Sequence, residues 1–404
     1  MFALVACSSG AAPSDPSFGE TAPESQSAAP IQSAASSAAE IVSPSTSPLT
    51  GAPRITWTEI EFDGHIADII GDGARFVAVG AGSSGASAWT SAEGMSWEQH
   101  DVPDQTFGQF PNGADITAGM RTLVRLGETL YSFGATPIFI DASRGAGWRW
   151  TDGQAWEAIQ STSDFFGGEV MAVTASHEAL VASTVTFGGG PQGHLGTWRW
   201  APAESWVKTS LSPEILVGAL AWADGTFLAV GSSTDAAGGA QLSMWTSADG
   251  LGWTSVRIPD DMSGVCALTS MAAGGFLAFG RAGDRVAAWT SRDGASWVEG
   301  ELEHADASGV TDDNLSLGAA CGVVAAGNGL VAVVQVDDAL IWTSHDGTNW
   351  EFQEELEVSG AHVALTGHMP LAAVGRRVLL ADARSDPAAP DGLRQVLLLG
   401  VVEP

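Results

Sequence analysis

The chain has 404 residues, 45% of them hydrophobic, and its 16 lysine and arginine residues face 47 aspartate and glutamate residues, for a formal net charge of −31. This balance excludes nucleic-acid binding, which needs basic residues that displace phosphate counterions, and adhesion to an anionic membrane through overall charge. No apolar run approaches the roughly 20 residues that a membrane-spanning helix needs. Fifty glycines and 16 tryptophans beside a single tyrosine indicate many short strands joined by tight turns.

The first segment, residues 1–7, ends in Leu4-Val5-Ala6-Cys7. An aliphatic residue and two small residues before a cysteine resemble the lipobox of bacterial lipoproteins. In that family the cysteine is diacylglycerol-modified and becomes the mature N-terminus. The resemblance therefore implies lipidation at Cys7 and a location on the extracellular face of the bacterial cell membrane. Six preceding residues are too few for a complete signal peptide, so either the true start lies upstream or the match is accidental.

Residues 8–53 form a second segment of biased composition. Of these 46 residues, 35 are Ser, Ala, Pro, Thr or Gly. Such a composition cannot bury a core and predicts a disordered tether, which as a flexible coil spans roughly 35–40 Å root-mean-square. Tether and lipobox together favour a lipid-anchored protein over a disordered N-terminus with a chance cysteine.

A repeat bracketed by two tryptophans follows the tether. Its clearest copies read WTSADGLGW, WTSRDGASW and WTSHDGTNW, and successive copies are 44 to 59 residues apart. A repeat of this period is typical of propellers and other repeat architectures. The six copies occupy residues 89–97, 150–156, 200–206, 245–253, 289–297 and 342–350.

Each unit also carries short apolar runs before its first tryptophan, such as the run at 227–231. Runs of this length between turn signals predict strands, and four strands per unit predict a β-propeller blade. A seventh unit begins near His362 and supplies three strands, and the segment Ile55–Ile60 supplies the fourth, which removes an open sheet edge. We therefore predict an all-β, seven-bladed β-propeller over residues 54–404, closed by its N-terminal strand.

The turn between the paired tryptophans resembles the Asp-box, or bacterial neuraminidase repeat, of sialidases and sortilin-type receptors. That family's pattern is Ser-x-Asp-x-Gly-x-x-Trp. The copy from Ser247 to Trp253 is one residue shorter, and Glu93 replaces the aspartate in the first copy. We expect the aspartate to accept backbone N–H bonds, the glycine to supply a positive φ and the tryptophan to fill the space between sheets. This structural role falls to Asp249, Gly250, Trp253, Asp293, Gly294, Trp297, Asp346, Gly347 and Trp350.

The resemblance to sialidases implies three arginines for the substrate carboxylate, a tyrosine nucleophile with a partnering glutamate, and an aspartate acid/base. The Arg-Ile-Pro that precedes the Asp-boxes in that family occurs here at residues 257–259, after the fourth box. The single tyrosine, Tyr131, falls in the second strand of blade 2, where the family's nucleophile is not expected. We therefore assign no catalytic residue and favour a non-catalytic protein.

Other chemical patterns are weaker. The glycines at 80, 82 and 85 match a dinucleotide fingerprint but lead into a strand, without the helix N-terminus that binds phosphate. The eight histidines show no metal-ligand spacing, so no metal or cofactor is expected. A two-carboxylate glycosidase stays an open alternative, because the distance between its two carboxylates depends on the fold and not on their spacing in the sequence. Such an enzyme would need an acid of raised pKa at the channel mouth. Adjacent acids occur at Asp260-Asp261, Asp312-Asp313 and Asp337-Asp338.

Cys266 and Cys321 open the first strands of blades 5 and 6, so they could lie close in space. Two alternatives are open in an exported protein: the two cysteines form a disulfide, or they remain two buried thiols.

In propellers related by this repeat, the connections between blades share one face with the turns between the second and third strands, opposite the Asp-boxes. Long loops there are the candidate ligand face. Its candidate residues are Phe107, Phe110, Asp141, Arg144, Phe165, Phe166, His194, Asp312 and Asp313.

Two functions follow from these expectations. The first is a cell-surface-anchored, non-catalytic, monomeric propeller that binds a glycan or protein partner and meets the membrane only through its lipid anchor. The alternative is a glycoside hydrolase of the exo-sialidase-like type.

Overall fold

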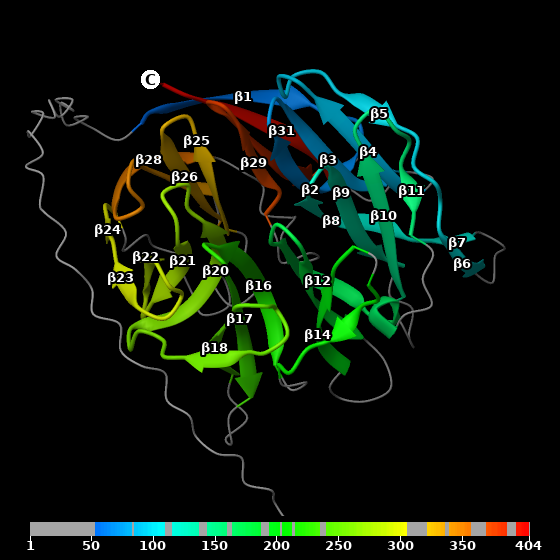
Figure 1. Cartoon of the computed structure of the whole chain (residues 1–404). Helices are drawn as coiled ribbons and strands as arrows, with labels where there is room; N and C mark the ends of the chain where they lie inside the picture. The colour runs from blue at the N-terminus through cyan, green and yellow to red at the C-terminus, as the bar shows by residue number, and fades with distance from the viewer. Residues whose placement is uncertain are drawn as a thin grey trace, which may run out of the picture. The chain divides into compact units, whose positions relative to one another are not determined.

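Figure 1 shows the computed structural model of the chain. The residues that the structure describes are 53–82, 85–109, 115–136, 144–159, 164–186, 194–202, 204–211, 215–234, 240–304, 321–335, 339–356, 369–385 and 393–403. Cys7 and residues 8–52 of the expected tether lie outside them.

Seven antiparallel sheets follow one another around a ring, as Figure 1 shows. We call each sheet a blade and its strands a to d from the centre outwards. Blades 1 to 3 are β2 (His65–Asp72), β3 (Arg75–Gly82), β4 (Gly85–Ser91), β5 (Glu98–His100); β8 (Gly119–Leu126), β9 (Thr129–Ala135), β10 (Gly145–Thr151), β11 (Glu157–Ala158); and β12 (Glu169–Ala175), β13 (Leu180–Thr186), β14 (His194–Trp200), β15 (Val207–Lys208).

Blades 4 to 7 complete the ring. Their strands are β16 (Leu216–Ala223), β17 (Thr226–Thr234), β18 (Ala240–Ser247), β19 (Thr254–Val256); β20 (Met262–Ser270), β21 (Phe276–Ala282), β22 (Arg285–Ser291), β23 (Trp297–Glu299); β25 (Cys321–Ala326), β26 (Gly329–Gln335), β27 (Ala339–Ser344), β28 (Asn349–Leu356); and β29 (Leu371–Val374), β30 (Arg377–Ser385), β31 (Leu393–Val402), β1 (Ile55–Glu61). The connections add β6 (Thr106–Gln109), β7 (Asp115–Thr117), η1 (Asp164–Gly167) and β24 (Glu301–Leu302), which runs parallel beside β28.

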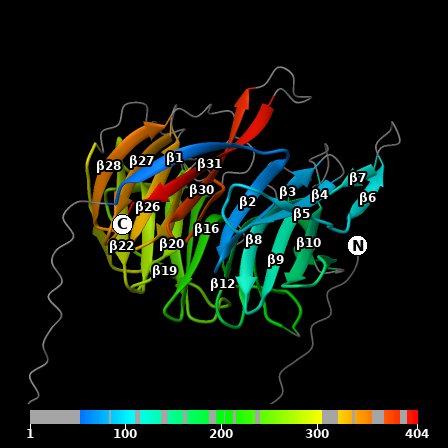
Figure 2. The ribbon, with the colours of Figure 1, turned by 90° about the horizontal axis from the view of Figure 1, so that it is seen from above.

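The N-terminal strand closes the ring. β1 pairs antiparallel with β31 over seven residues, from Ile55 opposite Val402 to Glu61 opposite Val396. The predicted seven-bladed all-β propeller and its closure by the N-terminal strand are therefore confirmed. β30 and β31 extend past the other strands at one side of the ring (Figure 2).

The two sides of the ring differ in their connections. The turns from strand a to b and from c to d lie on one side, which we call the turn face. The turns from b to c and the connections between blades lie on the other side, the mouth face, because neighbouring strands of each sheet are antiparallel. The turns between paired tryptophans are c–d turns, so they belong to the turn face.

The core is divided among the spaces between neighbouring blades. Strand b supplies most of it, with apolar residues on both of its faces, because strand b lies between two strands and two blades. Trp89 of blade 1, for example, packs with Leu379 and Leu397 of blade 7 in the space between these two blades. The repeated apolar runs thus place one buried strand in each sheet.

Inner strands in five blades carry a β-bulge near the mouth face. The extra residues of the first four are Ala67, Arg121, Met171 and Gly218, and β20 has two bulges, around Ser263 and Cys266. A bulge re-aims the side chain of its extra residue.

A glycine on strand b accompanies most of these bulges. A Cβ on Gly134 would lie 1.8 Å from the carbonyl oxygen of Gly119, and one on Gly80 equally close to that of His65. The bulged strand therefore approaches so closely that a larger residue would collide with its backbone.

Buried polar side chains cross between blades where strands cannot pair. The Gln395 side chain on β31 accepts from the Ile66 amide (2.5 Å) and donates to the Ile66 carbonyl (2.9 Å) on β2. Asp68 on β2 accepts in the same way from the Leu123 amide of β8 (2.6 Å). Each side chain thus hydrogen-bonds to the backbone of the neighbouring blade, where no strand pairing joins the two sheets.

Replacing Gln395 by methionine tests this connection. The change leaves a buried amide and a buried carbonyl of Ile66 without these partners, and each such loss costs about 1–3 kcal/mol. We expect Gln395→Met to lower the free energy of unfolding by about 2–4 kcal/mol in urea denaturation. Gln241→Met, at an exposed position of β18, is the control and should change stability little. Equal stabilities of the two variants would contradict this role of Gln395.

Candidate functional site

The c–d turns of blades 4, 5 and 6 share one hydrogen-bond pattern. In blade 4, the Ser247 hydroxyl accepts from the Gly250 amide (2.9 Å), and Asp249 Oδ1 accepts from the amides of Leu251 (2.8 Å) and Gly252 (3.0 Å). Gly250 has φ 74°, in the region that favours glycine. Asp293 and Asp346 repeat these contacts in blades 5 and 6.

These hydrogen bonds hold the aspartates in the charged form. Backbone amides lower the pKa of Asp249 and Asp293 below the ordinary aspartate value, against a smaller effect of burial. The pKa of Asp346 is also lowered: burial opposes the shift, but the amides of Asn349 and Thr348 and the Asn349 side chain outweigh it. Each carboxylate thus accepts hydrogen bonds from its own turn and stabilises that turn.

The second tryptophan of each pair packs beside its turn. Trp350 is 2% exposed and donates from Nε1 to the Gly347 carbonyl (3.0 Å), and half-buried Trp297 donates likewise to Gly294 (3.2 Å). Trp253 is half-buried, and its Nε1 has no partner. The turn of blade 1 keeps the serine contact, from the Gly94 amide to the Ser91 hydroxyl (2.8 Å). No hydrogen bond of Glu93 accompanies it among the described residues.

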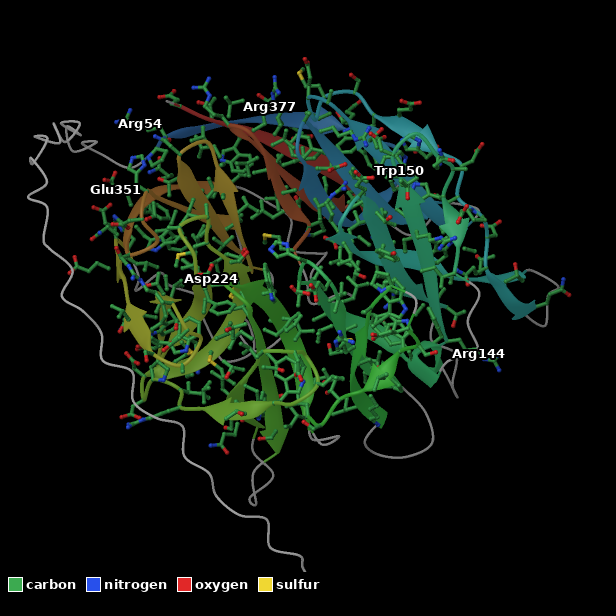
Figure 3. All side chains as sticks on the ribbon, viewed as in Figure 1. Arg54, Arg144, Trp150, Asp224, Glu351 and Arg377 are labelled. Carbon is green, nitrogen blue, oxygen red and sulfur yellow. A yellow bond between two sulfur atoms is a disulfide. The ribbon has the colours of Figure 1, made fainter. Side chains whose placement is uncertain are left out.

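Few residues of the expected ligand face are described with their side chains. Phe110, Asp141, Asp312 and Asp313 lie outside the described residues, and the side chains of Phe107 on β6 and His194 on β14 do too. Arg144 is exposed just before β10, and Figure 3 shows it at the edge of the molecule.

The placement of Phe165 on a ligand face was wrong. Phe165 is 0% exposed and stacks on Trp206, with ring centroids 3.7 Å apart. It also contacts Phe133 and Trp198 edge to face, so it fills the space between blades 2 and 3. Phe166 is partly exposed and packs against the start of β10, near Gly145 and Gly147.

The mouth face holds a charge pair that the sequence analysis missed. Arg121, the bulge residue of β8, forms an ion pair with Glu169, the first residue of β12, between blades 2 and 3. The Glu169 side chain is 7% exposed and its Oε2 has no hydrogen-bond partner, whereas the Arg121 side chain is 26% exposed. Burial lowers the pKa of the Arg121 guanidinium. The available signal was an arginine near the start of an inner strand, beside the buried Met120.

Cys266 and Cys321 form a disulfide, with Cα atoms 5.6 Å apart. It joins the inner strands β20 and β25 of blades 5 and 6. The bond links the inner strands of two neighbouring blades, whose outer parts also meet through the backbone pairing of β24 with β28.

Four carboxyl groups and one tyrosine among the described residues have shifted pKa values. Where a carboxyl pKa departs from its ordinary value, at Asp152, Asp249, Asp293 and Asp346, it is lowered. Tyr131 lies on β9, packs edge to face on Trp200, and has a pKa raised by burial. No three His, Cys, Asp or Glu side chains gather as a metal site would need in the part of the chain that is described. None of its helices is long and apolar enough to cross a membrane.

Comparison with known proteins identifies the fold. No protein-family model and no curated protein matches the chain. Among solved structures, it is similar to a catalytically inactive virginiamycin B lyase from Staphylococcus aureus with quinupristin (9% identity, 87% of this chain and all of that chain, TM-score 0.51). Weaker similarities include YCF48 bound to D1 peptide (13%, 87% and 98%, TM-score 0.49) and Trypanosoma rangeli sialidase with sialic acid (14%, 74% and 57%, TM-score 0.45). The chain spans 57% of that sialidase chain.

The c–d turns make a pH-dependent contribution to stability that can be measured. Because the pKa of Asp346 is lower in the folded state, its stabilisation is present above the unfolded value near 3.9 and is lost as the pH falls. We expect Asp346→Ala to lower the free energy of unfolding by about 1 kcal/mol at pH 6, since the turn is solvent-exposed, and by progressively less as the pH falls below about 4 towards the lowered folded-state pKa.

The natural Glu93 provides the matched comparison in the same measurement. Glu93→Ala should be nearly neutral, whereas Glu93→Asp should stabilise the blade 1 turn by about 0.5–1 kcal/mol, because the shorter carboxylate can accept the turn amides. A pH-independent effect of Asp346→Ala would contradict this account.

Proposed function

We propose that the protein is a cell-surface-anchored, non-catalytic propeller that binds a glycan or protein partner on its mouth face, beside Arg121 and Glu169. The observation that carries this proposal is the half-buried guanidinium of Arg121 on a bulge of an inner strand. An arginine held this way can donate hydrogen bonds to a sugar hydroxyl, a carboxylate or a peptide carbonyl.

The rigid ring supports binding as the role of this face. Seven blades, interblade hydrogen bonds and a disulfide hold the inner strands in place, so the mouth presents its groups without reorganisation, which favours affinity. Solved propellers of weak similarity include ones described with a peptide, with sialic acid and as a fucose-specific lectin. Partners of both classes are thus compatible with the architecture.

The surface location is part of the same proposal. The lipobox-like Leu4 to Cys7 and the small-residue segment that follows support a lipid anchor. The Cys266–Cys321 disulfide supports a compartment outside the cytoplasm, where such bonds persist. The turns between paired tryptophans support kinship with the Asp-box repeats, since their serine, aspartate and glycine make the contacts expected of that motif.

Binding to glycan and peptide arrays tests the proposal. The probe is the full chain with Cys7→Ser, which cannot be acylated. The test variant is Arg121→Met/Glu169→Leu, because removing Arg121 alone would leave a buried charge at a cost of about 3–5 kcal/mol. We expect the wild type to bind a saturable ligand and the double variant to bind it at least about tenfold more weakly, the loss of one charged hydrogen bond.

Arg149→Ala is the control, because Arg149 pairs with Glu157 on the exposed outer part of blade 2. Its affinity should equal that of the wild type. Equal affinity of the folded double variant would place the ligand elsewhere, and hydrolysis of an array glycan by the wild type would favour the glycosidase alternative.

A further inference from the structure

Three arginines gather at the turn face where the ring closes. Arg54 directly precedes β1, and Arg376 and Arg377 form the turn from β29 to β30. The amides of Glu403 and Val402 donate to the carbonyls of Arg54 and Arg376, both at 2.8 Å, so the arginines flank the end of β31. Two strand spacings, about 10 Å, separate their backbones. Figure 3 shows Arg54 and Arg377 along the same rim.

These arginines differ from most others in their partners. Arg75, Arg121, Arg125, Arg149, Arg199, Arg257 and Arg285 all form ion pairs with carboxylates. Within the described ranges, none of the three at the closure does. Arg144 and Arg292 also form no ion pair with a described residue, and they stand singly, far along the chain from one another. In a protein of net charge −31, a cluster of three free guanidinium groups is a local exception.

Two exposed apolar side chains lie on the same face of the ring, one of them directly opposite Arg377. Val401, opposite Arg377 in the ladder, is 41% exposed, and Met95 in the c–d turn of blade 1 is 59% exposed. The neighbouring Gly94 faces blade 7, since a Cβ there would lie 3.0 Å from the side chain of Leu399 on β31. We call Arg54, Met95, Arg376, Arg377 and Val401 the closure patch.

We propose that the closure patch docks on an anionic lipid surface once the chain is anchored, and so orients the mouth face away from the membrane. This inference rests on the lipid anchor of the proposed function. Arginines beside exposed apolar side chains match the interface between anionic headgroups and acyl chains. The N-terminal segment enters the ring at Pro53 and Arg54, within the patch, so an anchor at Cys7 holds the patch at high local concentration near the lipid.

Most of the net negative charge does not oppose this docking. Charges more than about 8 Å apart are screened at physiological salt, so only groups that face the surface closely matter. Exposed Glu93 and Glu403, two residues from Met95 and Val401, are the nearest acids along the chain, and Glu351 lies on the adjacent blade 6 in Figure 3. Each arginine near such a surface favours the docked state about fivefold. Three give on the order of a hundredfold, enough to orient an anchored protein but not to recruit a free one.

The three cysteines allow a direct test on the full chain. Cys266 and Cys321 are in a disulfide, so Cys7 is the remaining thiol and can be coupled to a maleimide lipid in vesicles. The chemical anchor works whether or not cells acylate Cys7, so failure of docking is distinguishable from failure of natural lipidation. Amide hydrogen exchange, read by mass spectrometry, then reports which face is covered.

We expect slower exchange in the turns around Met95 and Arg376 on vesicles that contain phosphatidylglycerol, and no change on pure phosphatidylcholine. High salt should remove the protection. Arg376→Ser should reduce the docked-to-free ratio about fivefold, and Arg54→Ser/Arg376→Ser/Arg377→Ser about a hundredfold. Arg292→Ser is the matched control, an exposed arginine of the blade 5 c–d turn, and should have no effect.

Three results would overturn the inference. They are equal protection on both vesicle types, unchanged protection in the triple variant, and protection of the mouth face in place of the turn face. Protection that depends on protein concentration without vesicles would also overturn it, since a second copy would then cover the patch.

Discussion

The pairing of β1 with β31 is the constraint on which the whole ring depends. Blade 7 receives three strands from the C-terminal end of the chain and its fourth from residues more than 300 positions earlier. Without β1, β31 would expose a long edge, and blade 7 would lack the side chains of Ile55 and Trp57 that cover it. The residues of β1 therefore complete the sheet of blade 7, cover part of its core and hold the two ends of the propeller next to each other.

Closure also needs contacts between sheets that cannot share a ladder. Gln395 and Asp68 make them with side chains that reach backbone groups of the next blade, and the disulfide makes one covalently. The bulges of the inner strands shape the mouth face of the ring. They interrupt regular pairing at the mouth face and so permit a residue such as Arg121 to leave the apolar packing of its strand. Stability and a usable surface come from different residues of the same strands.

The architecture could be read from the sequence because its signals are local and repeated. Paired tryptophans, the glycine at positions such as Gly250 and short apolar runs recur in unit after unit, and one leftover strand at the N-terminus matched one missing strand at the C-terminus. The site could not be read in this way. Phe165 lies in a connection between two blades, where a ligand-facing aromatic is expected. It is nevertheless buried in the core, because it stacks on Trp206, 41 residues later in the chain. Arg121 and Glu169 lie 48 positions apart and meet only because two inner strands are neighbours. Such pairings depend on register and on bulges, which no single unit of the repeat specifies.

The position of β1 has a mechanical consequence. The N-terminal segment joins the propeller through this strand, so any pull between that segment and something held on the mouth face passes along the β1–β31 ladder before it reaches the rest of the ring. β1 runs antiparallel to β31 and is an outer strand, with a partner on one side alone among the described strands. The seven-residue ladder therefore takes such a load first, and after its detachment blade 7 would be held to blade 1 by the Gln395–Ile66 contacts and side-chain packing, while the disulfide still held blades 5 and 6 together.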